Sequence, residues 1–231
     1  MPVGRFIRTT LADWQGKDCC RLEFRGYDVR CPFLGGSELY EADGPSVDTS
    51  EILGYIESRK GNLEGIVLGG GEPLADPGLY RFLKDLRKTK VPILLETWGM
   101  RPEELDDLAG AMMFDEVRLF MPAAPTSPKL SDATSGTADP SKLQRSAEVL
   151  ERLDVPHGIW TWAVPEISGP EGITAIARIA GQGTTLTVSQ FDPSKASSPK
   201  FREVRPYTRA EASALVAEAK KYARHVKLSG F

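Results

Sequence analysis

The sequence predicts an α/β protein folded as a partial (β/α)6 barrel of the TIM type. Short apolar segments rich in β-branched and aromatic residues alternate along the chain with segments of helical periodicity, and about six such pairs can be counted. Alternating strand and helix patterns indicate parallel βαβ units with right-handed crossovers. Six units are fewer than the eight of a closed barrel, so an open, crescent-like barrel is favoured. A doubly wound sheet is the alternative, because periodicity does not give the order of the strands.

Composition and charge fit one globular domain. The chain has 231 residues and a hydrophobic share of 41%, and we expect residues 1–231 to form a single domain with residues 1–19 as an N-terminal lead-in. The net charge of -3 comes from interspersed acidic and basic residues, which does not favour nucleic acid or an anionic membrane as a partner. No apolar run approaches the roughly 18 residues of a membrane span, and the N-terminus lacks the apolar core of a signal peptide. We therefore expect a cytoplasmic protein.

The predicted strands are short and mostly apolar. Residues 1–19 form the lead-in, for which we expect a short hairpin with turn residues from Asp13 to Lys17. Residues 20–24 then alternate apolar and polar side chains with the period of two that is typical of a strand. The later strands are predicted at residues 65–68, 91–97, 116–120, 157–164, 184–190 and 226–228.

The predicted helices begin at capping residues and show apolar positions three and four residues apart. Asp48 or Thr49 caps the first helix, and the pairs Asp76-Pro77 and Asp139-Pro140 start two others, because proline is favourable at the first helical position. The helices are predicted at about residues 48–56, 76–86, 102–110, 139–153, 173–180 and 208–223. Residues 122–138 form a long loop with almost no periodicity, and a loop of that length is usually functional or mobile.

A glycine-rich turn follows the strand at residues 65–68. In the run Gly69-Gly70-Gly71-Glu72-Pro73, consecutive glycines let the backbone approach a ligand closely, and Glu72 can accept hydrogen bonds from an amine. The spacing is neither a Rossmann fingerprint nor a P-loop. Taken alone, the run favours a tight strand-to-helix turn with a solvated Glu72 over a ligand-binding turn.

The second motif is the loop after the strand at residues 20–24, which reads GYDVRCPFL from Gly26 to Leu34. Together with Gly70-Gly71-Glu72-Pro73, this loop resembles the radical S-adenosylmethionine superfamily. The chain is most similar to the activating proteins of glycyl-radical enzymes, of the anaerobic ribonucleotide reductase activase type. In that family a loop of the form G-C-N-x-R-C-P-Y-C holds a four-iron, four-sulfur cluster through three cysteines. A G-G-E-P turn holds the amino group of S-adenosylmethionine.

The resemblance implies an incomplete cluster site. The three cysteine positions of the family are occupied here by Tyr27, Cys31 and Leu34, so two of three thiolates are missing. Leu34 cannot ligate iron, and a phenol at Tyr27 is a poor substitute for a thiolate. The resemblance therefore implies Cys31 as the one candidate metal ligand, no catalytic residue, and S-adenosylmethionine as a cofactor without its cluster. The candidate cofactor-binding residues are Gly70, Gly71, Glu72, Pro73 and Thr97.

Three hypotheses follow for the function. The leading hypothesis is a non-catalytic pseudoenzyme that binds a partner protein, such as a glycyl-radical enzyme, or an S-adenosylmethionine-like ligand. The alternative is an active activase whose four-iron, four-sulfur cluster is completed by non-standard or intermolecular ligands. A third hypothesis is redox sensing through Cys31 or the pair Cys19-Cys20, which requires an exposed thiol in an electropositive setting.

Bulky aromatic residues stand where the family often has polar ones. The resemblance implies that Trp98 and the run Leu119-Phe120-Met121 would fill a cofactor cavity or make a contact surface. Trp160 and Trp162 alternate on a predicted strand, which favours core packing over ligand stacking. His157 and His225 have no metal-ligand spacing around them and are expected to be structural or surface residues.

Overall fold

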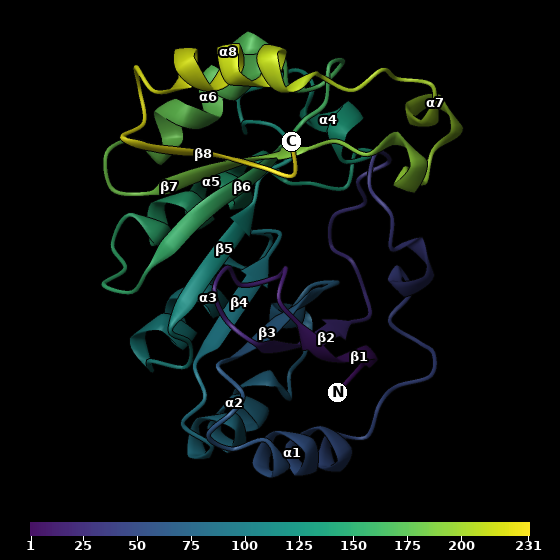
Figure 1. Ribbon diagram of the computed structural model, residues 1–231, viewed down its shortest axis with the longest axis vertical. Coiled ribbons are helices and arrows are strands. Elements are labelled where there is room, and N and C mark those ends of the chain that lie inside the picture. Colours follow the sequence, from purple (N-terminus) through teal and green to yellow (C-terminus); the bar gives the residue numbers. More distant parts are fainter. The chain divides into compact units, whose positions relative to one another are not determined.

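The computed structural model describes residues 1–231, and its eight strands follow one another in chain order in an eight-stranded sheet, from β1 to β8 (Figure 1). The strands are β1 Val3–Thr10, β2 Cys19–Phe24, β3 Gly65–Gly70, β4 Ile93–Thr97, β5 Glu116–Phe120, β6 His157–Ala163, β7 Thr185–Gln190 and β8 His225–Ser229. β1 pairs antiparallel with β2, whereas the pairs β2–β3, β3–β4, β6–β7 and β7–β8 are parallel. The prediction of an open, mostly parallel α/β barrel is confirmed.

Helices and short helical turns connect the strands. The α-helices are α1 Thr49–Ser58, α2 Leu79–Lys88, α3 Pro102–Gly110, α4 Leu130–Ala133, α5 Pro140–Leu150, α6 Pro170–Ala180, α7 Pro199–Arg202 and α8 Arg209–Ala219. The 3-10 turns are η1 Ser37–Leu39, η2 Pro73–Ala75 and η3 Pro193–Lys195. No helix is both long and apolar enough to cross a membrane.

Local capping signals explain most helix starts. Asp48 accepts a hydrogen bond from the Ser50 amide at the start of α1, and Asp139 does the same for Ser141 at the start of α5, as predicted. The prediction that Asp76-Pro77 starts the next helix is wrong. Asp76 instead accepts from the Gly78 amide in a turn at 2.6 Å, and α2 begins at Leu79. The long predicted loop at residues 122–138 contains the short helix α4.

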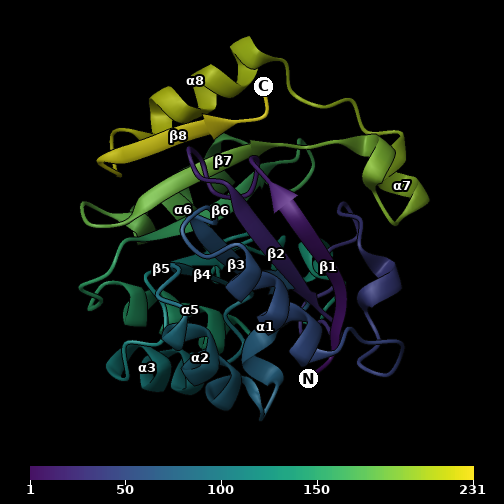
Figure 2. The ribbon, with the colours of Figure 1, turned by 60° about the horizontal axis from the view of Figure 1, so that its bottom comes forward.

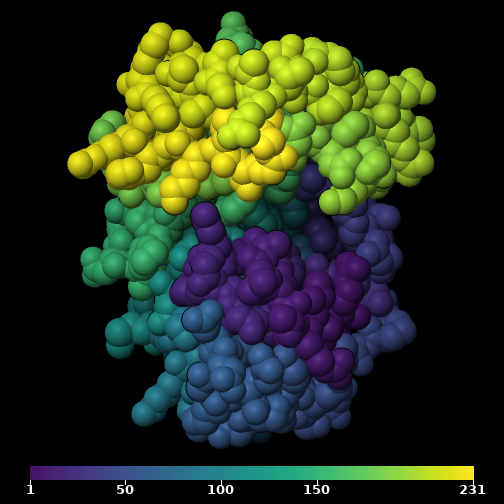
Figure 3. All heavy atoms as spheres, in the orientation of Figure 1, coloured from purple at the N-terminus to yellow at the C-terminus, as the bar shows by residue number.

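The chain divides into two compact units. Unit 1 comprises Met1–Asp28, Glu38–Thr97 and Glu103–Arg118, and unit 2 comprises Val29–Ser37, Trp98–Pro102 and Leu119–Phe231. In unit 1 the lead-in forms β1, which pairs with β2 as the predicted hairpin. Tyr55 of α1 packs its ring edge-on against Phe6 of β1 and donates a hydrogen bond to the Arg8 carbonyl at 2.6 Å. Figure 3 shows β1 (purple) at the surface beside the blue atoms of α1.

The register of unit 1 decides which side chains share a face of the sheet. Arg21 of β2 lies beside Val67 of β3, and Glu23 lies beside Gly69. Since successive side chains of a strand point to opposite faces, Arg21 and Glu23 share one face with Val67 and Gly69. The buried cluster Trp14, Cys19, Val67 and Leu94 forms the apolar end of that face.

In unit 2 the strands β6, β7 and β8 carry helices α6 and α8. Helix α8 contacts α6 and β8, and α6 contacts β6 and β7. Figure 2 shows α8 running beside β8. Thr208 caps α8 in a capping box with Glu211. Alternation along β6 buries Ile159, Thr161 and Ala163 and leaves Trp160 and Trp162 half-buried on the other face.

Candidate functional site

The glycine turn, residues 69–73, continues the pairing of β3 with β2 beyond the end of the strand. The Gly71 amide donates to the Phe24 carbonyl at 2.9 Å, and the Glu72 amide donates to the Gly26 carbonyl at 2.8 Å. Gly70 has a φ of 84°, which favours glycine. A Cβ on Gly71 would lie 2.4 Å from the Gly26 oxygen. The glycines are therefore needed for the backbone of the turn itself.

Glu72 and Thr97, two of the candidate cofactor-binding residues, are brought together in unit 1. The Glu72 side chain is 1% exposed, and its Oε1 accepts from the Leu74 amide at 3.1 Å, which caps η2. Its Oε2 accepts from the Thr97 hydroxyl at 2.9 Å. Pro73 follows as the first residue of η2, where its missing N–H costs nothing. Each carboxylate oxygen thus takes part in a hydrogen bond of the fold, although a carboxylate has lone pairs for more.

Tyr27 lies in unit 1 next to the turn. Its amide donates to the Tyr40 carbonyl at 3.2 Å, and its ring packs edge-on against the Tyr40 ring with centroids 5.0 Å apart. Burial, and after it the negative charge of Glu23, raises the pKa of the Tyr27 phenol well above its usual value. The neutral phenol is therefore the favoured form, and it is a weaker metal ligand than a phenolate.

Cys31 and Leu34 lie in unit 2, in residues 29–37, which we name the Cys31 loop. The Leu34 amide donates to the Cys31 carbonyl at 3.1 Å and so closes a turn. The Arg30 amide donates to the Thr137 hydroxyl at 2.9 Å. Cys31 is 2% exposed, and this burial raises the pKa of its thiol well above the usual value. The exposure that the redox-sensing hypothesis requires of Cys31 is therefore missing.

An aromatic core surrounds the ring of Phe33 in unit 2. Trp98 and Trp162 stack with centroids 6.1 Å apart and planes 17° from parallel, and Phe120 packs against both. Phe33 contacts Trp162 from another side, with ring centroids 6.1 Å apart. The six members of the aromatic core are Phe33, Trp98, Phe120, Trp162, Phe191 and Phe201. The ring contacts of Trp162 agree with the prediction of core packing, which was favoured over ligand stacking.

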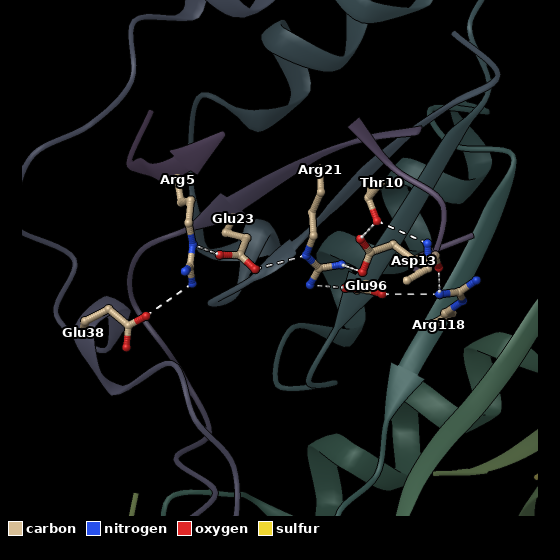
Figure 4. Close-up of polar contacts among 9 residues, drawn as sticks. Arg5, Thr10, Asp13, Arg21, Glu23, Glu38, Glu96 and Arg118 are labelled. Carbon is tan, nitrogen blue, oxygen red and sulfur yellow. Dashed lines mark hydrogen bonds and ion pairs between the residues drawn. The ribbon is translucent and has the colours of Figure 1, made fainter. Parts of the chain in front are cut away.

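Unit 1 contains a chain of ion pairs across β1, β2, β4 and β5 (Figure 4). At its centre Arg21 pairs with Glu96 at 2.8 Å, with Glu23 at 3.1 Å and with Asp13 at 3.3 Å. Glu96 also pairs with Arg118 at 3.5 Å. The members of this ion-pair chain are Arg5, Asp13, Arg21, Glu23, Glu38, Glu96, Glu116 and Arg118. Burial alone would lower the pKa of Arg21, but the charges of Glu96 and Asp13 outweigh it, and the pKa is raised.

Sequence reasoning missed the ion-pair chain and the contacts of Phe33. The available signal for the ion-pair chain was two pairs of charges, each two residues apart on a strand: Arg21 with Glu23, and Glu116 with Arg118. Such spacing places both charges on one face. A third signal was Glu96, the one charged residue of its strand. Their partners lie on other strands, so the pairing itself could not be predicted without the strand order.

The comparison with known families identifies the superfamily of this chain. The sequence profile of the Radical SAM superfamily matches residues 29–168, which is more than half of the chain. The chain therefore belongs to the radical S-adenosylmethionine superfamily. A comparison with curated proteins gave no match.

Solved structures of low sequence identity share the fold. One is SuiB of Streptococcus suis bound to its precursor peptide SuiA, with a TM-score of 0.69 and 13% identity over 88% of this chain and 46% of that one. Another is a radical SAM methyltransferase from Sphaerobacter thermophilus, with a TM-score of 0.69 and 12% identity over 93% of this chain and 67% of that one. This chain thus spans about half the length of SuiB. At this identity the likeness is one of fold.

The superfamily uses S-adenosylmethionine together with a four-iron, four-sulfur cluster that cysteine thiolates hold. The residues present here do not fit that cluster. One thiol, Cys31, is buried with a raised pKa, Leu34 has no donor atom, and Tyr27 carries a neutral phenol packed on Tyr40. No group of three or more His, Cys, Asp or Glu side chains is arranged to hold a metal ion. The glycine turn, in contrast, keeps the run Gly70-Gly71-Glu72-Pro73 on which the family resemblance rests.

Proposed function

We propose that this chain is a non-catalytic member of the radical S-adenosylmethionine superfamily that works by binding. Its ligand is S-adenosylmethionine or a related nucleoside, bound at the glycine turn of unit 1. The observation that carries the proposal is the donor set of the cluster positions, which offers one thiol where three thiolates are needed. Without a cluster, the family route has no electron donor for reductive cleavage of the cofactor.

The ligand part of the proposal rests on the intact turn. Gly70, Gly71, Glu72, Pro73 and Thr97 belong to one unit and form one hydrogen-bonded structure. In this proposal the Glu72 carboxylate, buried and fixed in place, attracts the ammonium group of the ligand's methionine part. A solved structure of SuiB at 13% identity is described as bound to S-adenosylmethionine, which supports this choice of ligand.

The first experiment is anaerobic reconstitution with iron and sulfide, followed by iron and sulfide analysis and by the visible absorbance of thiolate-bound iron. We expect no stoichiometric cluster in the natural chain. The matched control is the double substitution Tyr27→Cys with Leu34→Cys, which restores the family's three thiols and should allow a cluster to form. A stable cluster in the natural chain that is lost on Cys31→Ala would instead support the active-enzyme alternative, with ligands from outside the loop.

The second experiment titrates S-adenosylmethionine into the cluster-free protein by calorimetry. We expect measurable binding that weakens about tenfold or more in Glu72→Gln, because the substitution removes the negative charge that faces an ammonium group and leaves the side-chain shape almost unchanged. An unfolding curve for Glu72→Gln checks that the cap of η2 is still formed. Equal affinity in both proteins would mean that Glu72 serves the turn and not the ligand.

A partner protein or peptide is the second candidate, and one observation favours it. SuiB, which shares the fold over 88% of this chain, is described as bound to a precursor peptide. If calorimetry shows no binding of S-adenosylmethionine, a partner becomes the leading candidate. Glycyl-radical enzymes are the first partners to test, since the loop motif is most similar to their activating proteins.

A further inference from the structure

Unit 2 contains a second irregular segment that lies against the Cys31 loop. Residues 192–202, which we name the strap, follow β7 and comprise η3 and the single turn α7 (Figure 1). Six strap residues are exposed: Asp192, Ser194, Lys195, Pro199, Lys200 and Arg202. Ala196 and Phe201 are buried. The strap therefore covers the loop with one side and meets solvent with the other.

Three hydrogen bonds join the strap to the Cys31 loop. The Ser197 amide donates to the Leu34 carbonyl at 3.0 Å, and the Ser198 amide donates to the Pro32 carbonyl at 2.9 Å. The Ser197 hydroxyl donates to the same Pro32 oxygen at 3.2 Å, across a sequence separation of 165 residues. The carbonyls on either side of Phe33 are thus both held by the strap.

Apolar contact reinforces these hydrogen bonds at Phe33. Its ring lies 5.8 Å from the Phe201 ring and 6.4 Å from the Phe191 ring, centroid to centroid. Phe33 is 0% exposed, Phe191 1% and Phe201 3%. A Cβ on Gly35 would lie 3.1 Å from the Lys195 carbonyl oxygen, so the two backbones approach closely there as well.

The strap is also tied to itself. Asp192 accepts hydrogen bonds from the Ser194 amide and hydroxyl at 3.0 and 2.7 Å, which starts η3. The Arg202 guanidinium donates to the Ala196 carbonyl at 2.9 Å and to the Ser197 carbonyl at 3.4 Å. These bonds lie within residues 192–202, so the segment can move as one body without breaking them.

We infer that the strap is a conformational latch: it fixes the Cys31 loop in unit 2 and shields the Cys31 thiol, and it opens as a local unit. In loops that bind iron–sulfur clusters, metal–thiolate bonds hold the backbone in place. In this chain, the backbone of the Cys31 loop is held in place by the hydrogen bonds at Pro32 and Leu34 and by the buried Phe33 ring. The latch is independent of whether the glycine turn binds S-adenosylmethionine.

The test measures how fast an excess of a thiol reagent modifies each cysteine in the native full-length chain, with peptide mass spectrometry to separate Cys19, Cys20 and Cys31. All three thiols are buried, so each rate reports an opening of the structure around that thiol. We expect Cys31 to react faster than Cys19 and Cys20, which lie in unit 1. Phe201→Ala should raise the Cys31 rate by about a hundredfold, because the ring that closes over Phe33 is lost.

Two further variants sharpen the test. Ser198→Pro removes the amide hydrogen that donates to the Pro32 carbonyl, and the Ser198 φ of -87° is close to that of proline. The Cys31 rate should rise about fivefold to tenfold, which keeps the test informative if Phe201→Ala does not fold. Lys195→Ala is the matched control, because its 77% exposed side chain pairs with Asp192 of the strap itself and not with the loop. Its Cys31 rate should stay within about twofold of the natural chain.

The rates of the unit 1 cysteines decide the outcome. A rise that is confined to Cys31 supports the latch. Equal acceleration of Cys19, Cys20 and Cys31 would show that the substitutions lower global stability only, and no acceleration in either strap variant would show that the strap does not guard the loop. Either result would overturn the inference and would leave the proposed ligand binding at the glycine turn unaffected.

Discussion

The two units bury opposite chemistry around their strands. In unit 1 the ion-pair chain centres on Arg21, Glu96 and Arg118, whose side chains are only 12%, 5% and 10% exposed. In unit 2 the aromatic core centres on Phe33 and Trp98, which are 0% and 4% exposed. The first interior depends on matched charges, the second on ring area removed from water.

This difference predicts how each interior tolerates change. Ion pairs are directional, and Arg21 reaches Glu96 only because Gly69 between them has no side chain: a Cβ there would lie 2.2 Å from Glu96 Oε2. Aromatic packing does not depend on the direction of a single contact, and it can adjust to a smaller ring at modest cost in stability. We therefore expect the loss of one buried member of the ion-pair chain to lower the stability sharply, whereas the cost in the aromatic core should follow the side-chain volume that is removed.

The largest effect is expected for Glu96→Ala. Removing this carboxylate leaves two buried arginines, Arg21 and Arg118, each without one partner, and breaking a buried pair from one side typically costs 3–5 kcal/mol, so we expect about 4 kcal/mol. Urea unfolding followed by far-UV circular dichroism measures it. Glu38→Ala is the control at the exposed end of the same chain, where the carboxylate is 61% exposed and pairs with Arg5 at 3.2 Å. It should cost about 0.5 kcal/mol or less.

Trp98→Ala tests the other interior. We expect a loss of about 3 kcal/mol, because the substitution leaves a cavity beside Trp162 and Phe120. Trp98→Phe should recover more than half of that loss, since a smaller ring still fills part of the space. Near-UV circular dichroism should also lose the signal of the stacked pair in both variants. A loss in Trp98→Phe as large as in Trp98→Ala would mean that the aromatic core is as intolerant as the ion-pair chain.

Gly69→Ala tests why the first glycine of the turn is there. We expect a cost of about 1–3 kcal/mol in the natural chain, because the new methyl group pushes Glu96 away from Arg21. In a Glu96→Ala background the same substitution should cost much less, since the clashing atom is gone. A double-mutant cycle by urea unfolding measures this coupling. Gly54→Ala in α1, where a Cβ meets nothing within 4 Å, controls for the loss of a glycine.

Equal costs of Gly69→Ala in the two backgrounds would show that the backbone of the glycine turn, and not the ion pair, requires this glycine. Gly70 and Gly71 would not behave like Gly69 in such a cycle. Gly70 needs its positive φ, and Gly71 faces the Gly26 carbonyl, so neither depends on Glu96.

A structural feature of this chain can be predicted from the sequence when the residues that produce it lie close together in the chain. Asp139 is a correctly predicted cap, and Asp48 is the cap out of the two alternatives Asp48 and Thr49, because a cap is settled within four residues of chain. The start of α2 was predicted too early, because Asp76 serves a competing local turn with Gly78. The family resemblance placed Thr97 and Glu72 among the candidate cofactor-binding residues but did not predict the contact between them, and the ion-pair chain and the strap were not predicted either. Both join segments far apart in the chain, where periodicity carries no information.

Buried thiols are the one chemistry that both units share, and their predicted effect on stability is confined to alkaline pH. Burial raises the pKa of Cys20 in unit 1 from 9.0 to about 12, and it also raises the pKa of Cys31 in unit 2. A raised pKa means that the unfolded chain loses the proton first, so the stabilising contribution is complete below pH 9.0 and declines as the pH rises toward about 12. Between these limits the natural chain should lose about 1.4 kcal/mol per pH unit relative to Cys20→Val, in which nothing titrates at that position. Urea unfolding of both proteins at several alkaline pH values measures the difference between their free energies of unfolding. Taking this difference cancels the effects of lysine and tyrosine titration, which both proteins share.

Cys31→Val should differ from the natural chain in the same direction. If only Cys20→Val differs from the natural chain in this way, the strap opens at alkaline pH before unit 2 unfolds. If the free energy of unfolding depends on pH in both variants as it does in the natural chain, neither thiol is buried in solution.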